Sequence, residues 1–400
     1  MDNQLVGRAD PLAFLGEQVA DWKAAGTYNR LRILEGPCAS ESRFDGHEVI
    51  NLASNNYLGL TTHPKLIEAA IEATRKYGAG SGAVRTISGT MDLHMKLEEH
   101  IARFKNVEAC VVFQSGFAAN AGTVAAVLTP DDCIVSDELN HASIIDGCRL
   151  SKAKIRVFGH KDHAAAGRIL AELDGTPGRK ILITDGVFSM DGDIAPLPEL
   201  VALAERHGAI MMVDDAHASG VLGRNGRGTI DHFGLHGRVD IQVGTLSKAI
   251  GVLGGYVCGT KNLIEFLYQR ARPFLFSTSH PPAVTAACLA AFEILEEEPE
   301  RMERLWDNTR YFKAGLTDAG FDTGASETPI TPVMVGEAAK AHQFSRDLFD
   351  NGVLATGIAF PTVAQNKARV RTIVSAAHTT KELDRALDVF RRVGKQAGII

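Results

Sequence analysis

The chain repeatedly alternates short, nearly continuous apolar runs with longer segments whose apolar residues recur at helical spacing. Residues 181–183 and 210–213 are such runs, and residues 197–207 between them have the helical pattern. Apolar runs of this length are typical of strands buried on both faces, as in a parallel sheet covered by helices. The alternation therefore predicts an α/β fold with a mostly parallel central sheet and right-handed crossovers.

Six strands are predicted for this sheet, over residues 109–113, 132–136, 154–158, 180–185, 209–214 and 240–244. After Pro281 and Pro282 the pattern changes to two long helical segments, then shorter strands and a terminal helix. We therefore expect an N-terminal arm over 1–50, a large α/β domain over 51–282 and a smaller α+β domain over 283–400.

The composition excludes several classes of protein. The 400 residues are 45% apolar and 22% charged, which is enough apolar material for a sizeable core. Lys and Arg total 42 against 48 Asp and Glu, so the net charge of −6 argues against a nucleic-acid binder. No apolar stretch reaches the ~18 residues of a membrane span, and the N-terminal residues lack an apolar signal core. We expect a cytoplasmic protein, and no spacing of His or Cys indicates a metal site.

Polar residues follow the predicted strands where a ligand would bind, since ligands of α/β sheets lie beyond the carboxyl ends of the strands. Ser115 and Gly116 precede a helix, Asp214 ends one strand, Lys248 follows the next, and His141 follows another. Each residue alone also fits a structural role, as a turn, a helix cap, a hydrogen-bonded histidine or a surface lysine. Together they indicate a phosphate cradle, an aromatic ring, a carboxylate and a lysine, the parts that hold pyridoxal phosphate (PLP).

Several motifs resemble the α-oxoamine synthase family of PLP-dependent acyltransferases. They are NNYLG at 55–59, NHASI at 140–144, DGVFSMDG at 185–192, VDDAH at 213–217, GTLSKA at 244–249 and AAHT at 376–379. The resemblance implies the aspartate-aminotransferase-like fold, PLP fold type I. Within the family the chain is most similar to glycine C-acetyltransferases, over residues 140–150, 306–310 and 331–334.

The resemblance implies roles for five residues around the cofactor ring. Lys248 would form the Schiff base with PLP and remove the α-proton of the amino acid. His141 would stack on the ring, and Asp214 would pair with the pyridine nitrogen. His217 and Ser189 would donate hydrogen bonds near the phenolic oxygen and the reacting centre.

The resemblance also implies contacts with the phosphate and the substrate. The phosphate ligands would be Gly116, Phe117 and Thr245, joined by Ser277 and Thr278 of a neighbouring subunit. That arrangement implies a homodimer with shared active sites. Arg371, assisted by Asn55, would bind the substrate carboxylate, for which the planar guanidinium is suited.

The implied reaction joins an amino acid to an acyl-CoA and releases CoA. Glycine and acetyl-CoA are the substrates that the resemblance favours. The alternative is an 8-amino-7-oxononanoate synthase, which uses a pimeloyl thioester and alanine, or a synthase with broad or long-chain acyl specificity. Many relatives carry a different residue at the position of His280, near the expected acyl entrance. The preferred length of the acyl chain therefore stays open. Other hypotheses are an aminotransferase or PLP lyase and, from a different class, a PLP-free binding protein.

Overall fold

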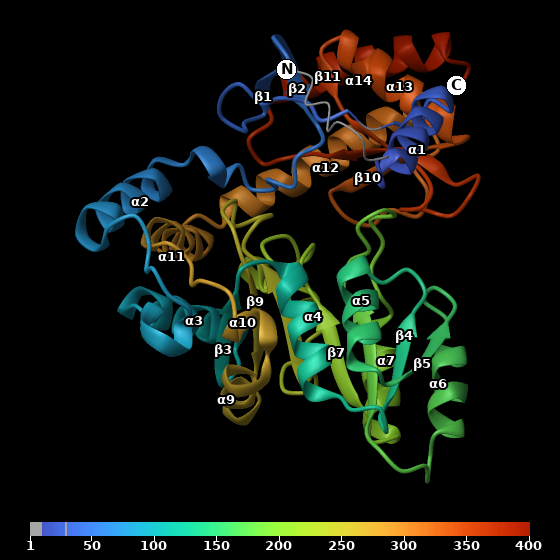
Figure 1. The fold of residues 1–400 in the computed structure, drawn as a ribbon. Helices are drawn as coiled ribbons and strands as arrows, with labels where there is room; N and C mark the ends of the chain where they lie inside the picture. Colours follow the sequence, from blue (N-terminus) through green and yellow to red (C-terminus); the bar gives the residue numbers. More distant parts are fainter. Residues whose placement is uncertain (1–9, 29) are drawn as a thin grey trace.

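The computed structural model describes residues 10–28 and 30–400, and a seven-stranded sheet lies at the centre of its larger part (Figure 1). The strand order is β3-β9-β8-β7-β6-β4-β5. In chain order the strands are β3 (Ala109–Phe113), β4 (Cys133–Asp137), β5 (Lys154–Phe158), β6 (Lys180–Asp185), β7 (Ile210–Asp214), β8 (Ile241–Thr245) and β9 (Gly255–Gly259). All neighbouring pairs are parallel except those of β9. The predicted α/β fold class with a mostly parallel central sheet is confirmed.

The six predicted strands agree with β3 to β8 to within one residue at each end. The sequence analysis misses β9, which is antiparallel to β3 and β8. Only three residues, Tyr256, Val257 and Cys258, separate the two glycines at its ends. A run this short gives little periodic signal, and glycine is depleted in strands.

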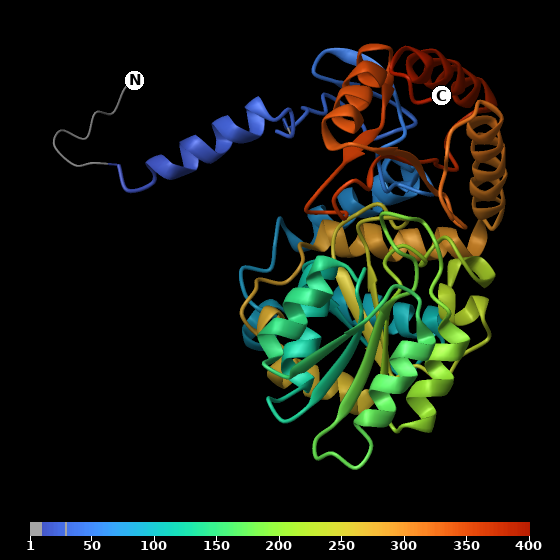
Figure 2. The ribbon, with the colours of Figure 1, turned by 90° about the vertical axis from the view of Figure 1, so that its right-hand side faces the viewer.

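Helices cover both faces of the sheet (Figure 2). They include α4 (Gly116–Val127), α5 (Ala142–Ser151), α6 (His163–Glu172), α7 (Leu197–Arg206), α8 (Thr229–His232), α9 (Lys261–Arg270) and α10 (Arg272–Leu275). Within β6, Ile181 and Ile183 pack in one apolar cluster with residues of α4, α5 and α9. Leu182 packs in another cluster, with residues of α6 and α7. This alternation is the period of two expected of a strand buried on both faces.

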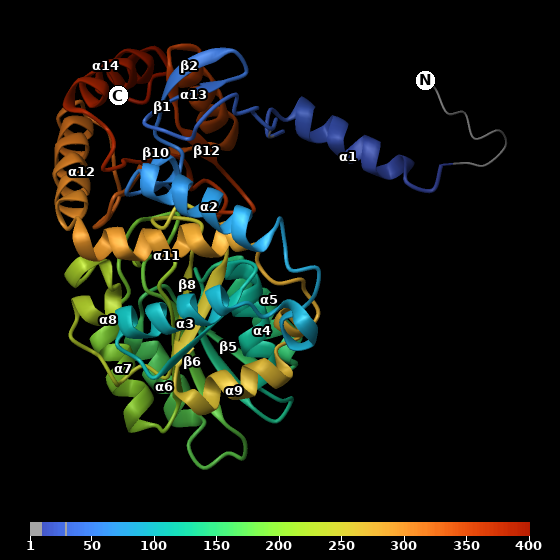
Figure 3. The same ribbon diagram turned by 90° about the vertical axis from the view of Figure 1, so that its left-hand side faces the viewer.

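Three further helices form a layer beside β3 and β9: α2 (Pro64–Tyr77), α3 (Asp92–Lys105) and α11 (Pro282–Glu297). The α11 helix begins at the predicted domain boundary and packs against both α2 and α3. Figure 3 shows it running between the large sheet below and the smaller part of the molecule above. No helix of the described residues is long and apolar enough to cross a membrane.

The smaller part contains two three-stranded sheets. One has the order β10-β13-β12 and is antiparallel, with β10 (Ile330–Gly336), β12 (Thr356–Ile358) and β13 (Ala368–Ile373). The other joins β1 (Glu41–Phe44) and β2 (His47–Asn51) to β11 (Val353–Leu354). The end of the expected N-terminal arm therefore pairs with C-terminal sequence, through the parallel contact between β2 and β11.

The helices of this part are α12 (Glu300–Asp318), α13 (Ala338–Asp350) and α14 (Thr380–Gln396). The α13 helix packs on the sheet of β10, β12 and β13, and α14 packs against α12 and α13. The α1 helix (Ala13–Ala24) has no buried residue and projects away from the rest of the chain (Figure 2). The domain boundaries at 50 and 282 stay predictions.

A buried ion pair ties α3 to the loop after β7. Lys105 Nζ lies 3.0 Å from Asp215 Oδ2, and the two side chains are 1% and 0% exposed. Lys105 also donates to the carbonyl oxygen of Arg227, and Asp215 accepts from the Thr229 backbone N–H at 3.1 Å. Because Asp215 directly follows Asp214, this pair anchors the segment on which the expected cofactor carboxylate lies.

Replacing Lys105 with methionine should destabilise the protein by about 3–5 kcal/mol, since Asp215 would remain buried without its cation. The measurement is the midpoint of chemical unfolding. Lys96→Met is the control, because the Lys96–Asp92 pair is on the surface, with side chains 60% and 50% exposed, and should change stability by less than about 1 kcal/mol. Equal effects of the two substitutions would contradict the structural role of the buried pair.

Candidate active site

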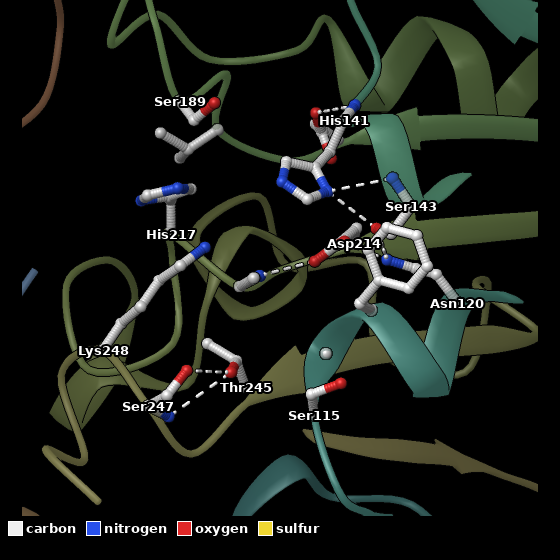
Figure 4. Close-up of a pocket in the computed structure, with 15 residues that line it drawn as sticks. Ser115, Asn120, His141, Ser143, Ser189, Asp214, His217, Thr245, Ser247 and Lys248 are labelled. Atoms are coloured by element: carbon white, nitrogen blue, oxygen red, sulfur yellow. Dashed lines mark hydrogen bonds between the residues drawn. The ribbon is translucent and has the colours of Figure 1, made fainter. Parts of the chain in front are cut away.

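A cavity of about 190 Å³ lies at the carboxyl ends of the central parallel strands (Figure 4). Its walls are formed by the residues that follow β4, β6, β7 and β8 and by the first turn of α4. Eight of the predicted site residues line it: Gly116, Phe117, His141, Ser189, Asp214, His217, Thr245 and Lys248. The fold therefore brings together residues from five separate segments of the chain.

One end of the cavity can hold an anion. Ser115 caps α4, with its Oγ accepting from the Ala118 N–H at 3.0 Å, and the first two residues of the helix, Gly116 and Phe117, line the cavity. The first N–H groups of a helix have no partner within the helix. Thr245, whose Oγ1 lies 2.8 Å from Ser247 Oγ, lies at the same end of the cavity (Figure 4). A Cβ at Gly116 would lie 3.4 Å from Thr245 Cβ, within the cradle. Helix N-termini with a positive dipole and free N–H groups bind phosphate.

Gly255 of β9 makes this cradle possible, although the sequence analysis does not single it out. A Cβ at Gly255 would lie 2.4 Å from the Ser115 carbonyl oxygen and 2.5 Å from the Gly116 nitrogen. Any other residue would push the start of α4 away from β9. Only the pairing of β3 with β9, which brings Phe113 opposite Gly255, reveals this requirement.

The carboxylate of Asp214 is buried at the end of β7 and held from two sides. Asn120 Nδ2 donates to Asp214 Oδ2 at 2.6 Å, and the Ala216 N–H donates to Asp214 Oδ1 at 2.8 Å. Asn120 Nδ2 also lies 3.0 Å from Ser143 Oγ, while its Oδ1 has no hydrogen-bond partner among the described residues. These contacts hold a negative charge at the edge of the cavity, where it can pair with a cationic ring nitrogen.

Lys248 reaches into the cavity from the segment after β8 (Figure 4). The pKa of its amine is lowered to about 8, mainly because the amine is buried. The negative charge of Asp214 raises this pKa, and the positive charge of Arg371 lowers it. A substantial fraction of the amine is therefore neutral near physiological pH. A neutral lysine amine is a nucleophile and a base.

Two histidines face the same cavity. His141 caps α5; its backbone N–H donates to Asp185 Oδ2 at 2.9 Å, and its Nδ1 lies 2.7 Å from Ser143 Oγ. His217 Nδ1 lies 2.8 Å from the hydroxyl of Tyr57. Desolvation lowers the pKa of both imidazoles, that of His217 well below the usual value. Both rings are therefore neutral at physiological pH and act as packing and hydrogen-bonding groups.

Four predicted residues do not line this cavity: Asn55, Ser277, Thr278 and Arg371. Arg371, on β13, donates from Nη2 to Asn55 Oδ1 at 3.1 Å, and its Nε has no partner in the described part of the chain. Its charge still lowers the pKa of Lys248, which places it beside the site. Ser277 and Thr278 follow α10, where the Thr278 carbonyl oxygen accepts from Gln114 Nε2 at 2.9 Å. Their expected contact with a neighbouring subunit stays a prediction.

The structure adds Asn120, Ser143, Asp185 and Tyr57 to the residues around the site. Asp185 ends its strand as Asp214 does, so the rule of polar residues at strand ends could have identified it. Asn120 and Tyr57 carry no such signal. Their contribution becomes visible only through hydrogen bonds to Asp214 and His217, across 94 and 160 residues of sequence.

Comparisons with known proteins agree with this geometry. The sequence profile of the family "Aminotransferase class I and II" matches residues 47–390. The protein named 8-amino-7-oxononanoate synthase from Symbiobacterium thermophilum is 62% identical over 387 residues, covering 97% of this chain and 99% of that protein. The protein of the same name from Thermoanaerobacter pseudethanolicus is 59% identical, covering 97% and 98%. A solved structure of a lysine-to-alanine variant of serine palmitoyltransferase from S. paucimobilis, with a bound PLP–myriocin aldimine, has a TM-score of 0.93 at 32% identity, covering 98% of this chain and 100% of that one.

These relatives confirm the predicted cofactor, PLP, and the residues present fit it. The cradle at Ser115 and Gly116 suits the phosphate, Asp214 suits the ring nitrogen, and Lys248 suits the aldehyde carbon. The specific resemblance to glycine C-acetyltransferases is not supported, since the relatives with 59–62% identity carry the other name. The chain belongs to the aminotransferase class I and II family of PLP-dependent enzymes and, within that family, groups with the α-oxoamine synthases.

Proposed function

We propose that this protein is an 8-amino-7-oxononanoate synthase that condenses a pimeloyl thioester with L-alanine. The observation that carries the proposal is the 62% identity to a protein of that name over 97% of the chain. The product, 8-amino-7-oxononanoate, has a chain of nine carbons, and its name therefore shows how many carbons each substrate supplies. Seven carbons come from the pimeloyl group and two from alanine, whose carboxylate leaves as CO₂. The new bond joins the alanine α-carbon to the thioester carbonyl carbon, and the carbon–sulfur bond of the thioester breaks to release CoA.

PLP, when bound, supplies an electron sink for the negative charge that develops at the α-carbon. Lys248 would hold the cofactor, and its amine, neutral when free, would take the α-proton. Asp214 would keep the ring nitrogen protonated, and Asn120 holds the Asp214 carboxylate in position. His141 would pack against the ring.

The amino acid is oriented by Arg371 and Asn55. Arg371 can offer its guanidinium to the substrate carboxylate, because its Nη2 is already positioned by Asn55 Oδ1 and its Nε is free of partners among the described residues. His217, fixed by Tyr57, and Ser189 face the reacting centre from the same cavity. Gly116, Phe117 and Thr245 hold the phosphate.

The assembly belongs to the same proposal. Ser277 and Thr278 lie outside the cavity of their own chain, which leaves them available to complete the phosphate site of a second copy. We therefore propose a cytoplasmic homodimer whose active sites are shared. Glycine and acetyl-CoA, the substrates first expected from the sequence, become the competing pair in the tests below.

CoA release should be fastest with pimeloyl-CoA and L-alanine. We expect kcat/KM for this pair to exceed that for acetyl-CoA and glycine at least tenfold, because each buried methylene contributes about 0.8 kcal/mol of binding. The measurement is CoA release across acetyl-, pimeloyl- and palmitoyl-CoA with alanine, glycine and serine, with Lys248→Ala as the blank. Preference for acetyl-CoA and glycine, or keto-acid-dependent turnover without CoA release, would refute the proposal.

The uptake of PLP by cofactor-free protein should depend on pH with a midpoint near 8. Only the neutral amine of Lys248 forms the covalent bond, so the rate should rise about tenfold between pH 7 and 9 and then level off. Stopped-flow absorbance of the bound cofactor measures this rate, with Lys248→Ala as the control. A rate that keeps rising tenfold per pH unit up to pH 10 would show an ordinary lysine and contradict the role of burial.

A further inference from the structure

A second cavity, of about 320 Å³, adjoins the cofactor cavity, and Ser189 lines both. It is lined by Leu139, Phe188, Ser189, Met190, Asp191, Met334, Thr362, Val363, Ala364, Lys367 and Arg369. In the cofactor cavity, Ser189 lies at the end opposite Thr245 and Ser115 (Figure 4). The second cavity therefore meets the first at the end away from the phosphate cradle, beside the reacting centre.

Most of the wall of this second cavity is apolar. Leu139 lies two residues before His141, Phe188 and Met190 flank Ser189, and Met334 comes from β10. The side chain of Val363 adds a further apolar surface from the segment between β12 and β13. A chain of methylene groups leaving the reacting centre would be removed from water along this wall.

The two cationic residues of the cavity, Arg369 and Lys367, differ in whether they have a partner. Arg369 is paired, since its Nη1 donates to Asp191 Oδ1 and, at 3.0 Å, to the Met190 carbonyl oxygen. Lys367, in contrast, forms no ion pair or side-chain hydrogen bond with any residue that the structure describes, and it is exposed. One cation thus remains without a counter-charge in a cavity whose own carboxylate, Asp191, is already neutralised.

We propose that this second cavity binds the acyl chain of the thioester and that Lys367 pairs with a carboxylate at the far end of that chain. The inference rests on the proposed function and extends it, because it makes Lys367 the residue that selects an acyl group with a terminal carboxylate. An acetyl group is too short to enter the cavity, and a simple fatty acyl group would leave Lys367 without a partner. Asp191 does not repel the incoming carboxylate, because Arg369 holds it.

The test compares pimeloyl-CoA with heptanoyl-CoA, which has the same number of carbons but ends in a methyl group. With wild-type enzyme and alanine, pimeloyl-CoA should have the higher kcat/KM. Lys367→Gln should lower kcat/KM for pimeloyl-CoA about three- to fivefold, as expected for a solvent-exposed ion pair, and leave kcat/KM for heptanoyl-CoA unchanged. The loss should appear in KM rather than kcat, because the distant carboxylate is bound equally in the ground and transition states.

Lys381→Gln is the matched control, since Lys381 is an exposed lysine of the same part of the molecule that does not line this cavity. Lys381→Gln should leave kcat/KM unchanged for both pimeloyl-CoA and heptanoyl-CoA. A second variant, Met334→Trp, fills the apolar wall and should lower the ratio of kcat/KM for pimeloyl-CoA over acetyl-CoA at least tenfold. Lys367→Gln tests the charged end, and Met334→Trp tests the apolar wall.

The outcomes separate this inference from the function on which it rests. If wild type prefers pimeloyl-CoA but Lys367→Gln affects pimeloyl- and heptanoyl-CoA equally, the function stands and the role of Lys367 is refuted. An unchanged acyl ratio in Met334→Trp would likewise exclude this cavity as the acyl site. If wild type prefers acetyl-CoA, the proposed function fails, and the inference fails with it.

Discussion

The buried carboxylate of Asp214 is the constraint around which the site is organised. A buried negative charge is costly unless it is hydrogen-bonded and paired. Asn120 and the Ala216 N–H supply the hydrogen bonds, and the protonated ring of PLP, when bound, would supply the positive charge. Immediately behind it, the neighbouring Asp215 is neutralised by Lys105. Because each carboxylate has its own partners, two adjacent aspartates can remain buried at the end of one strand.

The strand β13 carries residues of both proposed binding sites, that for the amino acid carboxylate and that for the acyl chain. Arg369 and Arg371 are two residues apart, so their side chains lie on the same face of the strand. Arg371 is held by Asn55 beside the cofactor cavity, whereas Arg369 holds Met190 and Asp191, next to Ser189. One strand of the smaller part thus positions both the expected carboxylate site and the loop whose Ser189 lines the cofactor cavity and the second cavity.

The substrate was harder to predict from sequence than the chemistry. The motifs that indicate PLP chemistry surround the cofactor, and family members with different acyl groups share that chemistry. One methylene in an apolar pocket changes binding by only about 1–3 kcal/mol, so acyl preference depends on details of the cavity wall. Here that wall combines Leu139, Met190, Met334 and Lys367, from four distant segments. The glycine and acetyl-CoA expectation rested on three short motifs, of which only residues 331–334 reach this wall, through Met334. The relatives are instead named 8-amino-7-oxononanoate synthases.

The sequence by itself determined the α/β class, the strands β3 to β8 and the grouping of Lys248, Asp214 and His141, because apolar periodicity reveals buried strands and parallel strands end at one edge. Only the tertiary structure decided that Asn120 holds Asp214, that Gly255 admits the start of α4, and that Tyr57 meets His217. These are contacts of a few ångströms between segments up to 160 residues apart. Periodicity shows which face of an element is buried, but the partner on that face is decided by packing in three dimensions.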